Sequence, residues 1–297
     1  MYVALGDPLE PIFEFFQLAC KQQGEKVIAL ADLGEKARFS WRFDSDTTSS
    51  AAQLADSSPF GDHEVKGVLV QKPPRLDADV APNAESERLQ MEKNAILIAW
   101  CWSLPCPVIN RYPTAFWFAP STAQVFWEPL LTRCGLALPD TILSNVEAAL
   151  RRFAADLGGN ICYSPFCDSQ TYRITGQESW AGLNKMRVNG PVRLVSFTPP
   201  VYRACVVGQQ IFWDRTVPDP LLHCEDQLKQ LAALAGLDFI EVRLIVQRGD
   251  LGVLAVEAFP DLKGFSEASL REIAGALVAI LQSPKPLHSP IAEGYWI

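Results

Sequence analysis

Charged side chains interrupt apolar segments in the second half of the chain, and three of them suit ligand chemistry. Arg203, Arg243 and Glu257 each stand among mostly apolar neighbours. A guanidinium grips a phosphate or a carboxylate through paired hydrogen bonds, and a carboxylate supplies oxygen ligands to Mg²⁺. The same residue types also form structural ion pairs between strands. We favour an ion pair for Arg243, with Glu257 or Glu241, and Glu257 is also the partner that we expect for Arg203.

Other catalytic chemistries find little support in the residue pattern. The three histidines, His63, His223 and His288, lie far apart, and we interpret each as an ordinary surface or hydrogen-bonded residue. The sequence contains no G-x-S-x-G nucleophile motif, no Walker A motif and no G-x-G-x-x-G motif. Nucleophilic hydrolysis and the common phosphate-binding loops are therefore not expected.

The eight cysteines are spread along the chain. Two pairs have a C-x4-C spacing, Cys101 with Cys106 and Cys162 with Cys167, whereas zinc sites use tighter, paired spacings. Most cysteines have apolar or aromatic neighbours, which favours buried free thiols in a reducing compartment. A metal site and disulfides are the alternatives.

Composition indicates a protein with an ordinary apolar core. The chain has 297 residues, of which 48% are hydrophobic and 20% charged, and its net charge is −8. This charge disfavours nucleic acid and anionic membranes as partners. We find no secretion signal and no apolar run long enough to cross a membrane, so a cytoplasmic location is expected.

Apolar periodicity predicts an N-terminal α/β lobe followed by a more β-rich region. Strands at 2–5, 27–30 and 67–70 and helices at 8–23 and 85–102 favour a parallel sheet. Residues 44–64 are rich in Ser, Asp and Thr and are predicted to form a loop. After Gly159 the pattern changes to short strands, which we expect at 160–164, 171–174, 192–197, 202–207, 210–213, 239–247 and 252–258. A final helix at 266–282 is expected to have Ser266 as its N-cap.

Five segments, in order, resemble motifs of the ATP-grasp superfamily, in particular of RimK-like carboxylate–amine ligases. Val253–Leu262 (VLAVEAFPDL) resembles the closing V-L-E-V-N-A-F-P-D-L motif of these ligases. The other four resemble the family's VNRP, GLxxPxT, YRVxVVG and GLDYAGVDLI segments, and they are Cys106–Pro113, Cys134–Thr141, Val201–Gly208 and Ala235–Ile245.

The resemblance implies a three-part ATP-grasp fold, in which an N-terminal parallel α/β lobe precedes two β-rich lobes around a cleft. It divides the chain into an N-terminal α/β domain at 1–118 and an ATP-grasp-like domain at 119–297. ATP and Mg²⁺ are the cofactors of such ligases. The family-equivalent nucleotide positions here are Ser164, Ser196, Arg203 and Arg243.

The chain departs from the family pattern at the positions that hold metal and phosphate. Arg243 replaces the Asp that is the first metal ligand, and Ala255 replaces the Glu that is the second. Glu257, which replaces the Asn, is the one metal position that keeps an oxygen ligand. Ser164 stands where a phosphate-binding lysine is expected, and the loop at 165–172 has no glycine to form a phosphate cradle. Arg203 matches the arginine that faces the reaction centre, which makes it the catalytic candidate.

Three functional hypotheses follow. The first is a non-catalytic protein with an ATP-grasp fold that binds a protein, a peptide or another ligand and needs no cofactor; homo-oligomerisation is left open. The second is an active ATP-dependent ligase with a rearranged site, in which Glu257 holds Mg²⁺ and Arg203 and Arg243 hold the phosphates. The third is an unrelated α/β binding or scaffold protein. We further predict that Arg243 and Glu257 lie on adjacent antiparallel strands, face the same side and form an ion pair within about 4 Å.

Overall fold

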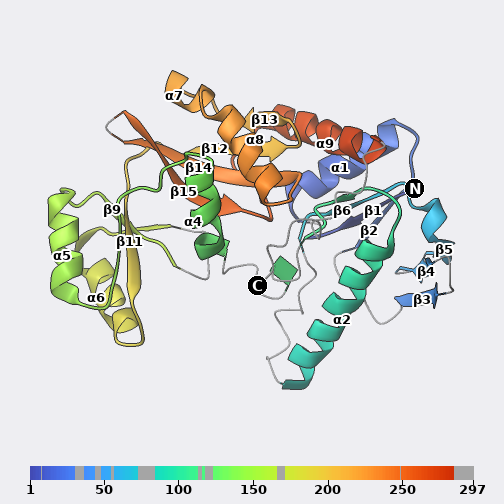
Figure 1. The fold of residues 1–297 in the computed structure, drawn as a ribbon, viewed down its shortest axis with the longest axis horizontal. Helices are drawn as coiled ribbons and strands as arrows, with labels where there is room; N and C mark the ends of the chain where they lie inside the picture. Colours follow the sequence, from blue (N-terminus) through green and yellow to red (C-terminus); the bar gives the residue numbers. More distant parts are fainter. Residues whose placement is uncertain are drawn as a thin grey trace. The chain divides into compact units, whose positions relative to one another are not determined.

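The computed structural model describes residues 1–7, 9–30, 37–43, 48–54, 57–72, 84–112, 116–117, 123–165, 171–247 and 249–283 (Figure 1). Two compact units emerge from the contacts within the chain. The first contains Met1–Phe118, Gly236–Phe239 and Phe259–Ile297, and the second contains Ala119–Ala235 and Ile240–Ala258. No helix among the described residues is long and apolar enough to cross a membrane.

The first unit is built on a parallel sheet with the strand order β2-β1-β6-β7. Its strands are β1 (Tyr2–Leu5), β2 (Val27–Leu30), β6 (Gly67–Val70) and β7 (Val108–Ile109). Every residue of β1 and β6 is buried, as expected for strands that are covered on both faces. Helices α1 (Pro11–Gln22) and α9 (Glu267–Gln282) pack against each other, and α9 also contacts β6 and β7. Ser266 accepts a hydrogen bond from the Ser269 N–H at 3.1 Å, which confirms it as the N-cap of α9.

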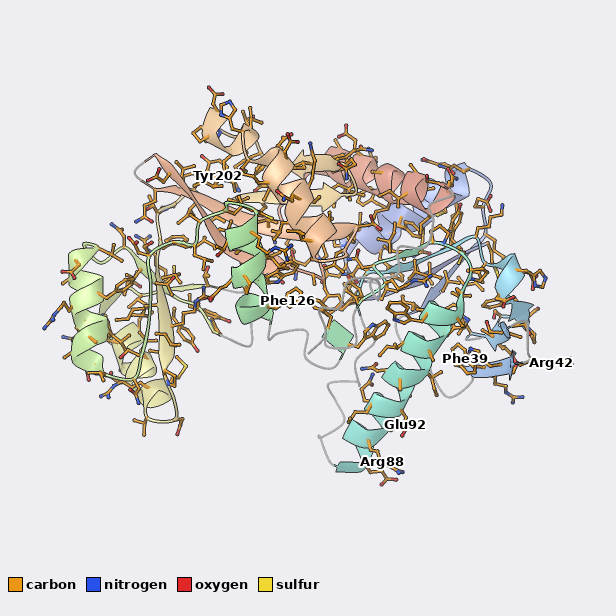
Figure 2. All side chains as sticks on the ribbon, in the orientation of Figure 1. Phe39, Arg42, Arg88, Glu92, Phe126 and Tyr202 are labelled. Carbon is orange, nitrogen blue, oxygen red and sulfur yellow. The ribbon has the colours of Figure 1, made fainter. Side chains whose placement is uncertain are left out.

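The predicted loop at 44–64 is wrong in part. The structure has a three-stranded antiparallel sheet of β3 (Arg38–Phe43), β4 (Thr48–Gln53) and β5 (Phe60–Gly61), followed by the short helix η1 (Asp62–Glu64). The residues of β4 do not alternate between apolar and polar, so the sequence gives no strand signal there. The strand forms by pairing with β3. There Phe39 stacks on Trp41 at 5.7 Å between ring centroids and lies 5.8 Å from Trp100 of helix α2 (Ala84–Ser103) (Figure 2).

The second unit contains two antiparallel sheets. One has the order β10-β9-β11-β8 and the other the order β13-β12-β14-β15. The strands of the first are β8 (Thr141–Ser144), β9 (Ile161–Tyr163), β10 (Tyr172–Arg173) and β11 (Val192–Ser196). The strands of the second are β12 (Tyr202–Val207), β13 (Gln210–Trp213), β14 (Phe239–Gln247) and β15 (Asp250–Glu257). A parallel α/β part and two antiparallel sheets are the fold class that the sequence predicts.

Helices cover parts of both sheets in this unit. They are α4 (Ala123–Arg133), α5 (Glu147–Asp156), α6 (Gly176–Arg187), α7 (Asp219–Leu222) and α8 (Glu225–Leu234). Leu150 of α5 and Leu183 of α6 share a buried cluster with Leu194 of β11. Neither α6 nor β8 was predicted. The strand β8 alternates exposed and half-buried residues, and it is recognisable only once it pairs with β11.

Asn110, in the segment that resembles a family motif, ties two distant parts of the first unit together. Its Nδ2 donates to the Phe239 carbonyl at 2.5 Å and to the Tyr112 hydroxyl at 3.0 Å. Its Oδ1 accepts from the N–H groups of Asp238 and Phe239 at 2.8 and 2.9 Å. Because Asn110 is only 1% exposed, water does not replace these bonds. In this chain the residue therefore has a structural role.

We predict that Asn110→Ala lowers the free energy of unfolding by about 2–4 kcal/mol, because it strands buried backbone groups without partners. Urea denaturation would measure the change. The matched control is Asn189→Ala, at an exposed position, with an expected change within about 0.5 kcal/mol. Equal effects of the two substitutions would show that the Asn110 network does not stabilise the unit.

The seven cysteines among the described residues are all buried free thiols, as predicted, and Cys167 lies outside the described residues. Burial raises the pKa of Cys20, Cys106, Cys162 and Cys224 to about 11. A buried thiol keeps its proton at a pH where the same thiol in the unfolded chain ionises. Burial therefore suppresses thiolate reactivity in the native state.

These raised pKa values predict a loss of stability in alkali. The contribution of each thiol is fully present below the unfolded pKa of about 9 and is lost as the pH rises through the folded pKa of about 11. The urea midpoint is therefore expected to fall between pH 9 and pH 11. Cys106→Ala should make the pH dependence shallower, and an unchanged slope in this variant would refute the assignment of part of it to Cys106.

Candidate functional site

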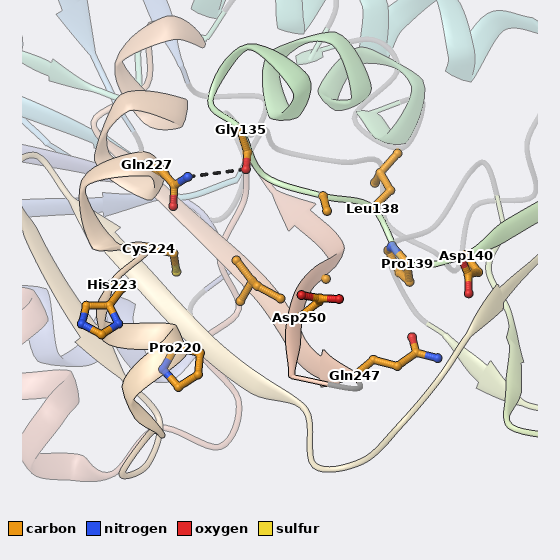
Figure 3. A pocket seen from close by; sticks show the side chains of 13 residues that line it. Gly135, Leu138, Pro139, Asp140, Pro220, His223, Cys224, Gln227, Gln247 and Asp250 are labelled. Atoms are coloured by element: carbon orange, nitrogen blue, oxygen red, sulfur yellow. Dashed lines mark hydrogen bonds between the residues drawn. The ribbon is translucent and has the colours of Figure 1, made fainter.

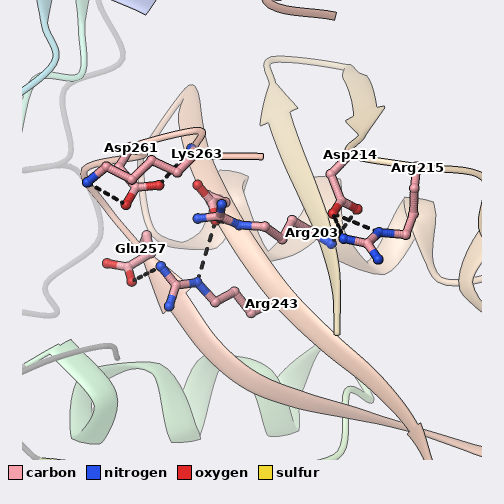
Figure 4. Close-up of polar contacts among 8 residues, drawn as sticks. Arg203, Asp214, Arg215, Arg243, Glu257, Asp261 and Lys263 are labelled. Carbon is pink, nitrogen blue, oxygen red and sulfur yellow. Dashed lines mark hydrogen bonds and ion pairs between the residues drawn. The ribbon is translucent and has the colours of Figure 1, made fainter. Parts of the chain in front are cut away.

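The charged side chains singled out in the sequence meet on three neighbouring strands of the second unit. Arg203 extends from β12, Glu241 and Arg243 from β14, and Glu257 from β15 (Figure 4). Arg203 Nε lies 2.6 Å from Glu241 Oε1, and Arg243 Nε lies 3.6 Å from the same oxygen. Arg243 Nη2 lies 3.3 Å from Glu257 Oε1. We call these four residues the Arg–Glu network.

Strand geometry explains why Arg243 and Glu257 meet. The strands β14 and β15 are antiparallel, and Glu241 is directly opposite Glu257, while Arg243 is opposite Ala255. Residues two apart on a strand share a face, so Glu241 and Arg243 both project toward Glu257. A bulge follows between Arg243 and Leu244. The predicted ion pair on adjacent antiparallel strands is confirmed.

Arg203 has a different partner from the one expected. Its 2.6 Å contact is with Glu241, whereas the sequence analysis named Glu257. The strand β14 lies between β12 and β15, so a side chain on β12 meets β14 first. The backbone N–H of Arg203 also donates to Asp214 Oδ1 at 3.0 Å. The backbone of Arg203 is therefore held by Asp214, and its side chain is held by Glu241.

The side chains of the Arg–Glu network are largely buried, so breaking one of its ion pairs is expected to cost stability. The side chain of Glu241 has no exposed surface, and those of Arg203, Arg243 and Glu257 are 14%, 18% and 18% exposed. Two guanidinium groups and two carboxylates make the network formally neutral, as buried charges require. Burial, and then the negative charge of Glu241, raise the pKa of the neighbouring Cys205 thiol well above its usual value.

The two serines that the resemblance placed at the nucleotide site are buried and engaged within the protein. Ser164 is 2% exposed, and its N–H donates to the Arg193 carbonyl at 3.0 Å. Ser196 is fully buried, and its hydroxyl donates to Gln247 Oε1 at 2.8 Å. Neither supplies positive charge. Most of the loop at 165–172 lies outside the described residues, so its role stays a prediction.

Apolar side chains join the two sheets of the second unit. Cys162 and Val195 from one sheet pack in a buried cluster with Ile245 and Leu254 from the other. All four are at most 2% exposed. At this position, side chains of the chain itself fill the space between the sheets.

A separate polar pocket of about 540 Å³ opens in the second unit (Figure 3). It is lined by residues between Gly135 and Asp140, by α7, α8 and the two residues between them, and by the end of β14 and the start of β15. Asp140, His223 and Asp250 bring titratable groups to its wall, and Gln227 donates to the Gly135 carbonyl at 3.4 Å. The sequence analysis predicted no site there, because its residues come from three separate segments.

Arg193 interrupts the apolar strand β11 and is 3% exposed, but its sequence context did not lead us to predict a site there. The signal that singled out Arg203 and Arg243, an arginine among apolar neighbours, is present here too. It was overlooked because Arg193 lies outside the family-like motifs.

Known structures match this architecture along nearly the whole chain. The macrocyclase MdnC from Microcystis aeruginosa, bound with the precursor peptide MdnA, is similar with a TM-score of 0.71 and 17% identity, covering 95% of this chain and 100% of that one. A RiPP-associated ATP-grasp ligase from Chryseobacterium gregarium, in complex with ADP and a leader and core peptide, has a TM-score of 0.70 and 11% identity, covering 96% and 97%. A RimK domain ATP-grasp protein from Sphaerobacter thermophilus has a TM-score of 0.57 and 15% identity, covering 95% and 100%.

The chain has an ATP-grasp fold. The predicted fold is thereby confirmed, and a RimK domain protein is among the similar structures. No family model matches the sequence, and no curated protein matches it significantly. This fold is at odds with the third hypothesis, an unrelated α/β protein.

The residues present do not fit the Mg²⁺ ion that an ATP-grasp fold implies. A magnesium site needs carboxylate oxygens and phosphate oxygens in an octahedron. Here the guanidinium of Arg243 lies 3.3 Å from the Glu257 carboxylate, so a cation already occupies the approach to the remaining oxygen ligand. Across the described part of the chain, no group of three or more His, Cys, Asp or Glu side chains is suited to a metal.

We predict that Glu241→Ala destabilises the second unit by about 3–5 kcal/mol, because it leaves the guanidinium groups of Arg203 and Arg243 without their shared carboxylate. Urea denaturation would measure this loss. Glu178→Ala, at an exposed position of α6, is the matched control, with an expected loss below about 1 kcal/mol. If Glu241→Ala unfolded at the same urea concentration as the native chain, the network would not be a stabilising element.

Proposed function

We propose that this chain is a non-catalytic protein with an ATP-grasp fold that acts by binding a peptide. The observation that carries the proposal is the Arg–Glu network, in which Arg243 pairs with Glu257 at 3.3 Å where the family resemblance puts metal ligands. A tethered guanidinium replaces the mobile cation of a ligase. The carboxylates are thereby neutralised without Mg²⁺.

Loss of nucleotide chemistry is consistent with the rest of the site. ATP carries several negative charges, and its binding needs cations that are free to face the phosphates. Arg203 and Arg243 are engaged with Glu241 instead. Ser164 is buried and neutral, and the apolar cluster around Ile245 fills space between the two sheets.

A peptide is the partner that the comparisons support. MdnC was solved with a precursor peptide, and the ligase from Chryseobacterium gregarium with a leader and core peptide. In an inactive protein, peptide recognition is the part of such a function that needs neither metal nor nucleotide. We further propose a cytoplasmic location, with residues 119–297 as the ATP-grasp-like domain, and no role for nucleic acid or membranes.

An active ligase with a rearranged site is the second candidate. Glu241 and Glu257 are directly opposite each other on β14 and β15, so the two strands keep two carboxylates at one place. If the arginines turned toward a bound nucleotide, Arg203 and Arg243 would face phosphates and Glu257 would be free to hold Mg²⁺. This arrangement requires the ion pairs of the Arg–Glu network to break.

Nucleotide binding distinguishes the two candidates. We expect that about 5 mM Mg-ATP leaves the melting temperature of the chain unchanged, whereas a ligand at 100 times its Kd stabilises a protein by about 2.7 kcal/mol. A catalytically active ATP-grasp ligase, melted in parallel under the same conditions, is the positive control. A clear thermal shift, with ADP release that depends on an acceptor peptide and is lost in Glu257→Ala, would replace the proposal with the ligase.

A further inference from the structure

Arg193 is a buried cation with two nitrogens that have no hydrogen-bond partner among the described residues. Its side chain is 3% exposed, and these two atoms, Nε and Nη1, are themselves buried. Leaving a buried charged donor unsatisfied is costly, so such groups are normally paired. Burial also lowers the pKa of this guanidinium, but an arginine remains charged at neutral pH.

The strand register shows which surface Arg193 occupies. Val195 is opposite Cys162 and Leu194 is opposite Tyr163, and the N–H of Ser164, the residue after β9, donates to the Arg193 carbonyl, so Arg193 lies beside Ser164. Alternation along β11 puts Arg193 on the same face as Val195, the face that packs toward Ile245 of the other sheet.

The same face is open on its other side. On β8, the residue opposite Arg193 is Leu143, which is 52% exposed. Thr141, two residues earlier on the same strand, is exposed as well. β8 is the edge strand of this sheet, so a group from solvent would have to reach the guanidinium from this exposed edge, while the apolar cluster lies on the other side, at Val195.

One carboxylate of the chain itself forms a long ion pair with Arg193. Arg193 Nη2 is 4.0 Å from Glu128 Oε1, at the limit of an ion pair and beyond hydrogen-bond distance, and the Glu128 side chain is 46% exposed. Glu128 is therefore a half-exposed partner with which another carboxylate would compete for the guanidinium.

We propose that Arg193 is a binding site for a carboxylate from another molecule, either an acidic side chain of a peptide or a free small acid. Either edge of the guanidinium offers a carboxylate two donors, Nη2 together with Nε or with Nη1, and such paired bonds are strong where water is excluded. A single cation beside the neutral Ser164 and near Glu128 suits one negative charge and not a polyphosphate. The proposal rests on the proposed function only for its peptide source.

The test uses the full chain without Mg²⁺ or nucleotide, at about 0.15 M salt to screen long-range repulsion. The probes are glutarate and the peptide acetyl-Gly-Gly-Glu-Gly-Gly-amide, with the Gln peptide as the neutral control. Calorimetry measures affinity, and the ¹⁵N signals of arginine Nε–H groups report which guanidinium is engaged. Binding of glutarate alone identifies a free acid as the source, and binding of the Glu peptide identifies a side chain.

Three variants isolate the guanidinium. Arg193→Met is expected to lower the affinity for the probe by about tenfold or more, the typical effect of losing hydrogen bonds to a charged group. The melting temperature of this variant should not fall. Arg152→Met, an exposed arginine of α5, should change nothing. Glu128→Gln removes the competing carboxylate and should tighten binding. An unchanged Arg193 Nε–H signal in Arg152→Met would confirm that this control leaves the site intact.

The proposal is overturned if neither carboxylate probe binds, if Arg193→Met binds as the native chain does, or if inorganic phosphate displaces glutarate at equal concentration. These outcomes do not depend on Mg-ATP. A thermal shift by Mg-ATP together with acceptor-dependent ADP release would remove the proposed function and leave the carboxylate site standing, whereas failure at Arg193 would leave the non-catalytic assignment untouched.

Discussion

A fully buried carboxylate constrains the sheet β13-β12-β14-β15 of the second unit. Glu241 sits on the central strand β14 with no exposed surface, and it needs positive charge within hydrogen-bond reach to remain ionised. Arg203 and Arg243 provide that charge from β12 and from β14 itself. This arrangement forms only if β14 lies between β12 and β15 and if Glu241 is opposite Glu257, which Arg243 also contacts. Such buried pairs are costly to break even where they contribute little net stability.

Neutrality within the Arg–Glu network also bears on function. In a metal-dependent site, bound metal ions neutralise the carboxylates. Here Arg203 and Arg243 neutralise Glu241 and Glu257, so the strands can pack without a bound ligand. By contrast, Arg193 on the other sheet has only a long ion pair with Glu128, and its Nε and Nη1 atoms have no hydrogen-bond partner among the described residues.

Strand positions in the second unit were predictable because β12, β14 and β15 are long apolar runs with recognisable motifs. The Arg243–Glu257 contact was predicted from residue type and from the family resemblance, which puts two converging metal ligands at these positions. The partner of Arg203 did not, because the order of strands in a sheet is absent from local sequence. The strand β4 was missed for another reason. Its Ser and Ala residues carry no alternation, and its pairing is supported by Phe39 and Trp41 on the adjacent strand. Asn110 was identified as part of a motif, but its bonds to Phe239 could be seen only in the folded chain.

The register of β14 and β15 has a consequence for any attempt to place a metal site on these strands. Ala255 lies directly opposite Arg243 and is 2% exposed. A glutamate introduced at Ala255 alone would meet a guanidinium across the strand pair and add a third carboxylate to a neutral network. Replacement of Arg243 alone would strip Glu241 and Glu257 of a counter-charge before any metal ligand was gained. A metal site here would therefore require changes on both strands together.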